Sequence, residues 1–215
     1  MKTKIKVDYR LTSLNKLEFI YEKDKFLKEF KNEFPKAWNV YGYVNKRGEK
    51  YNINFRKLYH NRCAYCGVST QIINSSEFEV DHFIPRSRTN YNASLRKEFI
   101  NGIYNLVNSC RLCNRSKEDF FDEKYVEILN PDNNNLPSVF HRKEDYTIVI
   151  SDEYKNNKTI STFYNKLKLN NQLRRLDFLL MEMKDFCEIY GDIERVSYPI
   201  LNLISNIEKK RRESY

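Results

Sequence analysis

Four of the five cysteines form two closely spaced pairs. Cys63 and Cys66 lie in the stretch CAYC, and Cys110 and Cys113 lie in CRLC. Each pair presents two thiolates to one ion, and four thiolates suit a tetrahedral Zn²⁺ site. About forty residues separate the pairs, more than in a usual zinc ribbon, so a folded segment must bring them together. We predict one structural zinc site; the alternative is two unrelated pairs of reduced cysteines.

An acidic residue stands beside a histidine between the two cysteine pairs. Asp81 and His82 end the alternating stretch EFEVDHF, residues 77–83, which is typical of a half-buried strand. An imidazole is a good general base at neutral pH because its pKa is about 6.5. A single histidine is more often structural, but the position of His82 beside Asp81 and between the two C-x-x-C pairs favours a catalytic role. His60 and His141 lack an acidic neighbour at ligand spacing, and we interpret both as structural.

Strand geometry sets a condition on this pair. Neighbouring residues of a strand point to opposite faces, so Asp81 and His82 can serve one site only if the chain leaves regular strand geometry there. Pro85 supports such an exit. After a polar loop, residues 103–110 form a second predicted strand, and residues 114–129 have apolar side chains at helical spacing. The expected order is therefore strand, loop, strand and helix, with zinc at the base.

The flanking segments are predicted from the same kind of periodicity. The expected elements are a helix over residues 13–34, a less regular aromatic stretch over 37–55, a strand over 146–151, one or two helices over 161–190 and a frayed basic end over 204–215. The lone Cys187 lies on an apolar helical pattern, and we predict that it is buried as a small hydrophobic side chain. The chain then divides into an N-terminal helical or irregular segment (1–55), a core (56–130) and a C-terminal strand plus helical region (131–215).

The composition points to a polyanionic partner. The 215 residues include 38 Lys and Arg against 29 Asp and Glu, a formal net charge of +9. Such a balance favours nucleic acid as the partner. No apolar run approaches the roughly 18 residues of a membrane span, and the basic N-terminus has no apolar signal-peptide core. We therefore expect a cytoplasmic protein without membrane association, in a reducing compartment where paired cysteines more often bind metal than form disulfides.

Four short stretches, in order, resemble one enzyme family. CAYC, VDHFIPRS, YNLVNSC and CRLCNRSK are similar to the HNH endonucleases of the zinc-knuckled ββα-metal (His-Me finger) type. The resemblance covers about residues 61–117, roughly a quarter of the chain. The third signature position, often His, is Asn114 here, which makes this an HNN variant. The glycines that often follow the D-H-x-x-P element are absent, so the loop conformation can differ from that of the family.

The resemblance implies a fold and an activity. The fold class is α+β, a ββα-metal core with a four-cysteine zinc site, flanked by mainly helical N- and C-terminal segments. The activity is hydrolysis of DNA phosphodiester bonds to leave 3′-hydroxyl and 5′-phosphate ends. His82 would be the general base, and Asp81 and Asn114 would hold a catalytic Mg²⁺ or Mn²⁺, which prefers hard oxygen ligands. Asn105 would tie the loop to the strand and orient the histidine.

Several basic residues flank these positions and are candidates for phosphate contacts, since Arg suits bidentate phosphate binding. They are Arg62, Arg86, Arg88, Arg111, Arg115 and Lys117. Each has a simpler alternative as a solvated surface charge. Asn114 could instead be a helix N-cap, and Asn105 could be an ordinary turn residue.

The C-terminal segment adds a more specific resemblance. The order LNP, a strand and LKLNNQLRRL is similar to accessory HNH nucleases of bacterial defence systems, of the Septu and retron-associated kind, in which the nuclease works beside an ATPase. Two other classes of function stay open. One is a zinc-stabilised module that binds nucleic acid without catalysis, and the other is a partner-binding protein with a vestigial nuclease core.

Overall fold

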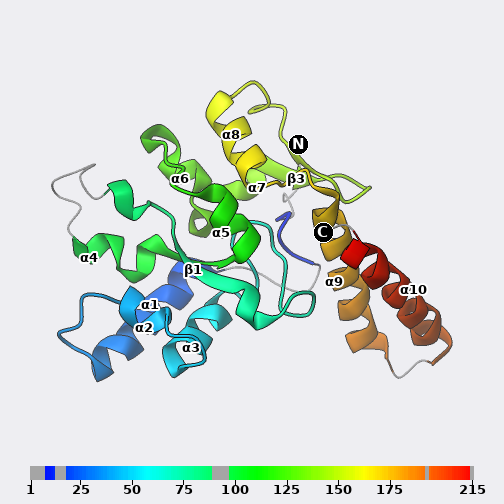
Figure 1. Ribbon diagram of the computed structural model, residues 1–215, viewed down its shortest axis with the longest axis horizontal. Helices are drawn as coiled ribbons and strands as arrows, with labels where there is room; N and C mark the ends of the chain where they lie inside the picture. Colours follow the sequence, from blue (N-terminus) through cyan, green and yellow to red (C-terminus); the bar gives the residue numbers. More distant parts are fainter. Residues whose placement is uncertain (1–7, 13–17, 89–96, 192–193, 214–215) are drawn as a thin grey trace, which may run out of the picture.

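The computed structural model describes residues 8–12, 18–88, 97–191 and 194–213 (Figure 1). Its helices are α1 (Phe19–Glu33), α2 (Tyr41–Val44), α3 (Lys50–Leu58), α4 (Lys97–Ile100), α5 (Arg111–Lys117), α6 (Val126–Leu129), α7 (Leu136–Val139), α8 (Lys158–Lys166), α9 (Gln172–Tyr190) and α10 (Glu194–Glu213). Its strands are β1 (Phe78–His82), β2 (Leu106–Cys110), β3 (Phe140–Arg142) and β4 (Ile148–Ile150). Small antiparallel sheets within a mainly helical chain confirm the α+β prediction.

The centre of the molecule is the antiparallel pair of β1 and β2, followed directly by α5. The register sets Phe78 opposite Cys110 and His82 opposite Leu106. Every residue of β2 is buried, because helices cover the hairpin on several sides (Figure 1). The two predicted central strands are therefore confirmed, and the order β1, β2, α5 has the expected strand–strand–helix form.

The N-terminal half is more helical than predicted. Helix α1 confirms the described part of the predicted helix; residues 13–17 lie outside the described residues. The less regular stretch predicted over 37–55 was wrong, because it contains α2 and the start of α3. Tertiary packing explains the difference: Tyr51 sets its ring edge-on to Phe26 and Phe30 of α1, and such aromatic pairs stabilise a short helix of weak intrinsic propensity.

The single helix predicted over 114–129 was also wrong. Helix α5 ends at Lys117, and Glu118 adopts a left-handed conformation with φ of 54°. That break turns the following chain, so that the Phe120 ring packs 5.2 Å from the Phe163 ring of α8. Of the apolar side chains at helical spacing, only those of Ile128 and Leu129 lie in an α-helix, α6, while Phe120 and Phe121 lie in the segment between α5 and α6.

The C-terminal region follows the prediction more closely. The strand predicted over 146–151 is β4, which pairs with the unpredicted β3, and the region 161–190 forms two helices, α8 and α9. Helices α9 and α10 pack along each other and extend away from the rest of the molecule (Figure 1). The basic end is helical as far as Glu213. Cys187 is partly exposed, so its predicted burial was wrong.

One apolar core joins the segments. It runs from Tyr9 to Leu169 and includes side chains from each of the ranges 1–55, 56–130 and 131–215. Among the described residues, no helix combines the length and the apolar character that crossing a bilayer requires.

The N-terminal residues 8–12 cross the first cysteine knuckle. The Tyr9 hydroxyl donates to the Tyr65 carbonyl at 2.5 Å, and Arg10 Nη1 donates to the carbonyls of Ala64 and Pro131 at 2.8 Å. Gly67, with φ of +80°, permits this approach, because a Cβ there would lie 2.3 Å from the Arg10 carbonyl oxygen. The buried Arg10 thus fixes the knuckle against the chain that follows α6.

Two glycines of nearly equal φ allow a matched test of this contact. Gly48 has φ of +78°, and a methyl group added there would meet no heavy atom within 4 Å. We expect Gly48→Ala to cost about 1–2 kcal/mol of unfolding free energy, from backbone strain alone. Gly67→Ala adds the overlap with Arg10 and should cost more than about 3 kcal/mol. Urea denaturation of the zinc-loaded proteins measures both, and equal losses would contradict the close crossing.

Candidate functional site

The four paired cysteines converge at one buried point. Their Sγ atoms all lie within 4.8 Å of one another, and Cys66 Sγ is 3.8 Å from Cys110 Sγ. A tetrahedral ion with Zn–S bonds of about 2.3 Å requires S–S separations of about 3.8 Å. Within the described part of the chain, this is the one group of three or more Cys, His, Asp or Glu side chains arranged to hold a metal ion. The donor set fits a structural zinc.

An arginine from α9 completes this centre. Arg174 Nη1 donates to Cys66 Sγ and Arg174 Nη2 to Cys113 Sγ, both at 3.1 Å. Zinc with four thiolates carries a net charge of −2, so a buried guanidinium compensates part of it. Arg174 was not predicted from the sequence, because it lies about sixty residues beyond Cys113, the last cysteine of the cluster. The contact ties the C-terminal helices to the zinc centre.

Burial acts on two of the four thiols in the same direction. Burial raises the pKa of Cys66 and of Cys113 well above the usual thiol range. A bound cation reverses this preference, because zinc binds the thiolate and releases the proton. Zinc binding at this centre is therefore expected to release protons.

One face of β1 looks towards α5 and carries Asp81. The carboxylate accepts a hydrogen bond from the Tyr65 hydroxyl at 2.6 Å and forms an ion pair with Lys117 Nζ at 3.1 Å. Burial raises the pKa of Asp81, and Lys117 and Tyr65 oppose that rise. The side chain is 6% exposed. Asp81 is thus a buried carboxylate with a fixed counter-charge.

Lys117 has a different place from the one predicted. It is fully buried, and Nζ also donates to the His82 carbonyl at 3.0 Å. A phosphate contact needs an ammonium that reaches solvent, so the predicted phosphate role does not fit this position. Lys117 instead clamps the end of β1 onto α5.

Asn114 lies within α5 and contacts the same face of β1. Its Nδ2 donates to Glu79 Oε2 at 2.7 Å. The N-cap of α5 is Cys110, so the alternative N-cap role of Asn114 was wrong. Glu79, Asp81 and Asn114 therefore bring oxygen donors to the interface of β1 and α5, and hard oxygen donors suit Mg²⁺ or Mn²⁺. Glu79 was missed as a site residue, although its spacing of two from Asp81 places both on one strand face.

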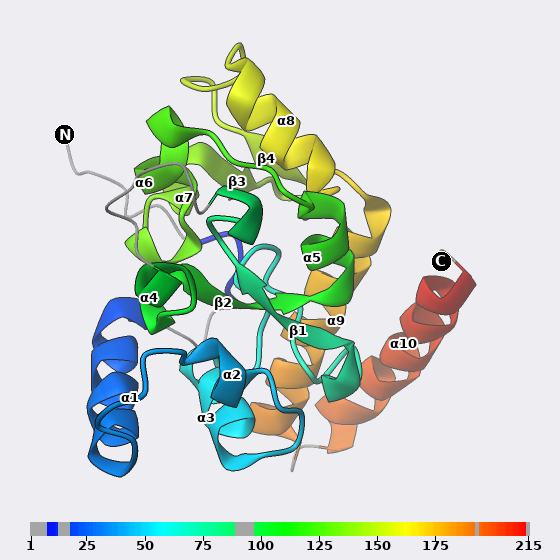
Figure 2. The same cartoon turned by 60° about the vertical axis from the view of Figure 1, so that its left-hand side comes forward.

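The opposite face of β1 carries His82. Its Nε2 lies 3.0 Å from Asn101 Oδ1 and 3.4 Å from Arg86 Nε. The imidazole also packs on the Tyr41 ring at 4.5 Å between centroids, and the Arg86 guanidinium covers the same ring at 4.3 Å. Figure 2 shows β1 between α5 on one side and α2 and α4 on the other.

The surroundings of His82 keep the imidazole neutral. Burial lowers its pKa to about 4; the Asn101 contact opposes this shift, and the charges of Arg86 and Lys117 add to it. A histidine that is unprotonated at neutral pH can accept a proton. The imidazole is therefore able to accept a proton at neutral pH, and its lowered pKa makes it a weaker base than an ordinary histidine.

Asn105 closes the turn after β1. Its Oδ1 accepts from the Ile84 amide at 2.8 Å, and its Nδ2 donates to the carbonyls of Ile84 and Ile100 at 3.0 Å. It is 1% exposed. Both its oxygen and its nitrogen are used in joining the segments on either side of the loop, beside the residues that contact His82.

The chain leaves regular strand geometry only after His82, one residue later than the prediction required. Pairing continues through His82 opposite Leu106, and the chain turns only afterwards, where the Phe83 amide donates to the Asn105 carbonyl. Asp81 and His82 consequently contact different groups on the two faces of β1. They can approach one phosphate only at the end of the strand, where His82 is the last paired residue.

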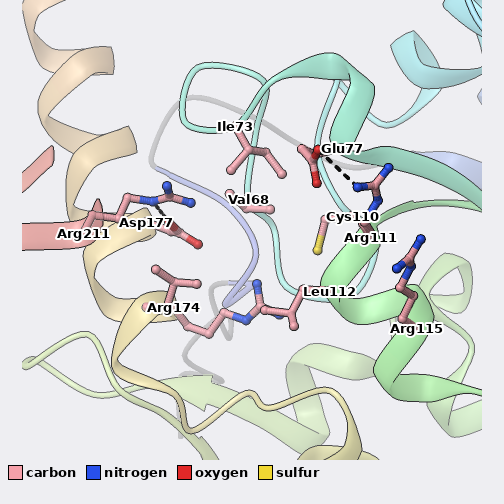
Figure 3. A pocket seen from close by; sticks show the side chains of 11 residues that line it. Val68, Ile73, Glu77, Cys110, Arg111, Leu112, Arg115, Arg174, Asp177 and Arg211 are labelled. Carbon is pink, nitrogen blue, oxygen red and sulfur yellow. Dashed lines mark hydrogen bonds and ion pairs between the residues drawn. The ribbon is translucent and has the colours of Figure 1, made fainter. Parts of the chain in front are cut away.

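The candidate phosphate-binding arginines differ in exposure and in location. Arg86 and Arg88 are exposed after β1, and Arg62 is buried against Thr12 and Asp185, so its suggested phosphate contact does not fit. Arg111 and Arg115 line a hollow of about 230 Å³ between α5 and the pair α9 and α10 (Figure 3). The side chains in that hollow are already partly paired: Arg111 with Glu77 at 3.6 Å and Arg211 with Asp177 at 2.5 Å. Arg86 is therefore the predicted arginine in direct contact with His82.

The environment of His82 can be measured directly. In the zinc-loaded protein without added Mg²⁺, we expect NMR titration to give an imidazole pKa of about 4, with His82→Gln identifying its resonances. Between that pH and the unfolded value of about 6.5, the unfolded state binds more protons, so stability falls as pH falls through this window. A pKa at the ordinary value would contradict the buried arrangement.

Comparison with known proteins agrees with the central part of the chain. Residues 63–120 match the family model for HNH endonuclease. The match covers about a quarter of the chain and includes both cysteine pairs, Asp81, His82 and α5. Neither the curated proteins nor the solved structures contain a match to the chain. Residues 63–120 are therefore similar to the HNH endonuclease family, which suggests a nuclease with a nucleic-acid substrate.

Proposed function

We propose that this protein is a metal-dependent HNH endonuclease that hydrolyses DNA phosphodiester bonds. The observation that supports this most is the place of His82 at the end of β1, 3.4 Å from Arg86 Nε and inside the segment that matches the HNH family. Further support comes from the oxygen donors on the other face of β1, which suit a divalent metal, and from the four-cysteine centre at α5, which suits zinc. The net charge of +9 suits a polyanionic substrate.

The chemistry assigns a step to each of two residues. His82 takes a proton from a water molecule as the water oxygen attacks phosphorus, and the bond from phosphorus to the 3′ oxygen breaks. Arg86, which lies 3.4 Å from His82 Nε2, contacts a nonbridging phosphate oxygen at that moment, since a guanidinium stabilises developing negative charge. The leaving 3′ oxygen takes a proton from solvent, which gives 3′-hydroxyl and 5′-phosphate ends.

Asp81 and Asn114 are the proposed ligands of Mg²⁺ or Mn²⁺, with Glu79 as a third candidate on the same face. A divalent cation in this place would neutralise charge on the phosphate and on the leaving oxygen. An ionised carboxylate has four lone-pair sites, so the bonds from Tyr65 and Lys117 to Asp81 leave room for a further ligand bond.

A change at Asn114 separates the catalytic metal from zinc. Asn114→Ala should fold, keep one Zn²⁺ per chain and bind DNA, because the cysteines and exposed arginines are unchanged. Cleavage should fall by at least roughly 10- to 100-fold, and excess Mn²⁺ should restore part of it, since Asp81 remains. Ser116→Ala, on the same helix, is the control. Loss of zinc from Asn114→Ala, measured by metal analysis, would mean that the ligands are misassigned.

Asp81 needs a more conservative change. Removing its charge leaves the Lys117 ammonium buried without a counter-charge, which typically costs about 3–5 kcal/mol. Asp81→Asn retains hydrogen-bonding capacity, and its thermal unfolding should be compared with that of the double variant Asp81→Asn, Lys117→Met before cleavage is interpreted.

The proposed function is tested by cleavage of labelled oligonucleotides. Wild-type protein with Mg²⁺ or Mn²⁺ should release fragments that carry 5′-phosphate and 3′-hydroxyl ends. Protein freed of loosely bound divalent metal, with zinc retention checked, should release none. Binding without cutting under every metal condition would favour the alternative, a non-catalytic zinc-stabilised module.

We further propose that the nuclease acts in bacterial anti-phage defence beside an ATPase partner. Support comes from the resemblance of residues 129–131, the strand β4 and residues 167–176 to accessory nucleases of such systems. Phage plaque counts on bacteria that carry the protein together with its neighbouring genes test this. Protection that survives in His82→Ala cells would show that nuclease activity is not the protective step.

A further inference from the structure

An aromatic pocket lies outside the residues assigned above. Trp38, Phe99 and Tyr104 are 47%, 39% and 46% exposed, and together they line a hollow of about 240 Å³. Large aromatic side chains gathered around one exposed hollow commonly mark a binding site. The volume is smaller than the roughly 300–1,000 Å³ of sites for drug-sized ligands, so it suits a single ring system.

The walls of the aromatic pocket are held in place. The Tyr104 hydroxyl donates to Asp24 Oδ1 at 2.6 Å, and Lys31 Nζ donates to the Ala37 carbonyl at 2.7 Å, next to Trp38. These bonds fix two of the walls before any ligand arrives. A preformed stacking surface loses little conformational freedom on binding.

The two segments that line the pocket, around residues 38–40 and 98–104, also carry the residues that contact His82. Asn101, which contacts His82 Nε2 at 3.0 Å, lies between Phe99 and the pocket residue Gly102. Tyr41, which packs on the His82 ring, directly follows the pocket residue Val40. The Tyr41 amide donates to the Asn101 carbonyl at 3.0 Å. The two segments that line the pocket are therefore joined where they hold His82.

Charge decides which part of a nucleic acid fits. Glu98 is among the residues that line the pocket, and Asp24 accepts a hydrogen bond from the Tyr104 hydroxyl. The cation among the lining residues, Lys31, already donates to a carbonyl. The charges of Lys31 and Glu98 offset each other among the lining residues, so the pocket offers no net positive charge to a phosphate, whereas a carboxylate accepts hydrogen bonds from an exocyclic amino group. Arg86, on the His82 side, is the natural phosphate contact.

We infer that the aromatic pocket binds one unpaired nucleobase of the substrate, next to the phosphate presented to His82. Bases stack on aromatic side chains in proteins that bind single strands. A base inside a duplex cannot enter such a pocket, so the preferred substrate is single-stranded or locally unpaired, with an amino-bearing base favoured at this position. This inference rests on the proposed nuclease function and specifies its substrate class.

Trp38 makes the inference testable, because it is the single tryptophan of the chain. Single-stranded oligonucleotides, added without divalent metal, should quench its fluorescence with saturation, and the matching duplex should not. Phe99→Leu keeps an apolar side chain but removes the ring, and should weaken single-strand affinity about 5- to 100-fold. Tyr198→Leu, on α10 and 69% exposed, should leave that affinity unchanged.

The same assay separates failure of this inference from failure of the nuclease assignment. Cleavage of single strands without Trp38 quenching, equal quenching by duplex, or unchanged affinity in Phe99→Leu would overturn the pocket assignment and leave the nuclease intact. If affinity is unchanged in Phe99→Leu, the aromatic pocket does not bind nucleic acid, and a protein ligand becomes the alternative. Quenching and affinity loss as expected, with no cleavage under any metal condition, would support base binding and refute the nuclease.

Discussion

Replacing His82 with Ala is expected to slow metal-dependent cleavage by about 10²- to 10⁴-fold, the usual contribution of a general base. Nucleic-acid affinity should stay near that of the wild type, because the proposed phosphate contacts come from exposed arginines such as Arg86 and Arg88. The two quantities are measured by single-turnover cleavage and by oligonucleotide binding without divalent metal.

Two further variants sharpen this result. His82→Gln keeps much of the side-chain volume and a polar contact for Asn101, and it should lose cleavage to a similar extent. His141→Ala changes an exposed histidine in β3 and should have no effect. If His82→Ala loses binding and cleavage in equal measure, then His82 is structural, and the nuclease assignment weakens with it.

The acid limb of the cleavage rate should reflect the buried imidazole. Because burial lowers the His82 pKa to about 4, this base stays unprotonated well below the ordinary value of about 6.5. Loss of activity through His82 protonation should therefore begin in a more acidic range than the bare sequence suggests.

Cys113→Ser is expected to abolish stable folding as well as activity. Structural zinc in zinc-finger peptides contributes about 10–16 kcal/mol of apparent binding free energy, which matches or exceeds the roughly 5–15 kcal/mol of a whole domain. Here the four sulfurs connect the first knuckle, the end of β2 and α5, and Arg174 adds α9. Removing one ligand therefore loosens the elements that position β1.

Circular dichroism and metal analysis measure this effect. The wild-type protein should hold about one Zn²⁺ per chain, whereas Cys113→Ser should lose zinc and show no cooperative thermal unfolding transition. Cys187→Ser removes the cysteine outside the cluster and should retain zinc, fold and activity. A folded, fully active protein without zinc would refute the zinc assignment.

Local patterns in the sequence were sufficient for the central elements. The alternation around Phe78 and Val80 predicted β1, and the two C-x-x-C spacings predicted the cysteine cluster, because period and ligand spacing are local properties. The contacts of Lys117 and Arg174 could not be predicted in this way. Each cation is buried by partners distant in the sequence, Asp81 in one case and the cysteines in the other.

The helices that were predicted wrongly also depend on contacts between residues distant in the sequence or on backbone conformation. Helices α2 and α3 depend on aromatic packing against α1, which no local period expresses. The end of α5 depends on the left-handed Glu118, where the residue type gives no warning of a break. The aromatic pocket joins residues 38 and 99 from two separate segments, so it becomes visible only in the folded chain.

The most direct test of the central claim is the opening of covalently closed DNA circles. Single-stranded and supercoiled double-stranded circles have no ends, so any linear or nicked product reports an internal cut. With Mg²⁺ or Mn²⁺, the wild-type protein should open at least one kind of circle, and His82→Ala should be slower by about 10²-fold or more. Equal rates for the two proteins, or circles that remain closed in both, would contradict a nuclease centred on His82.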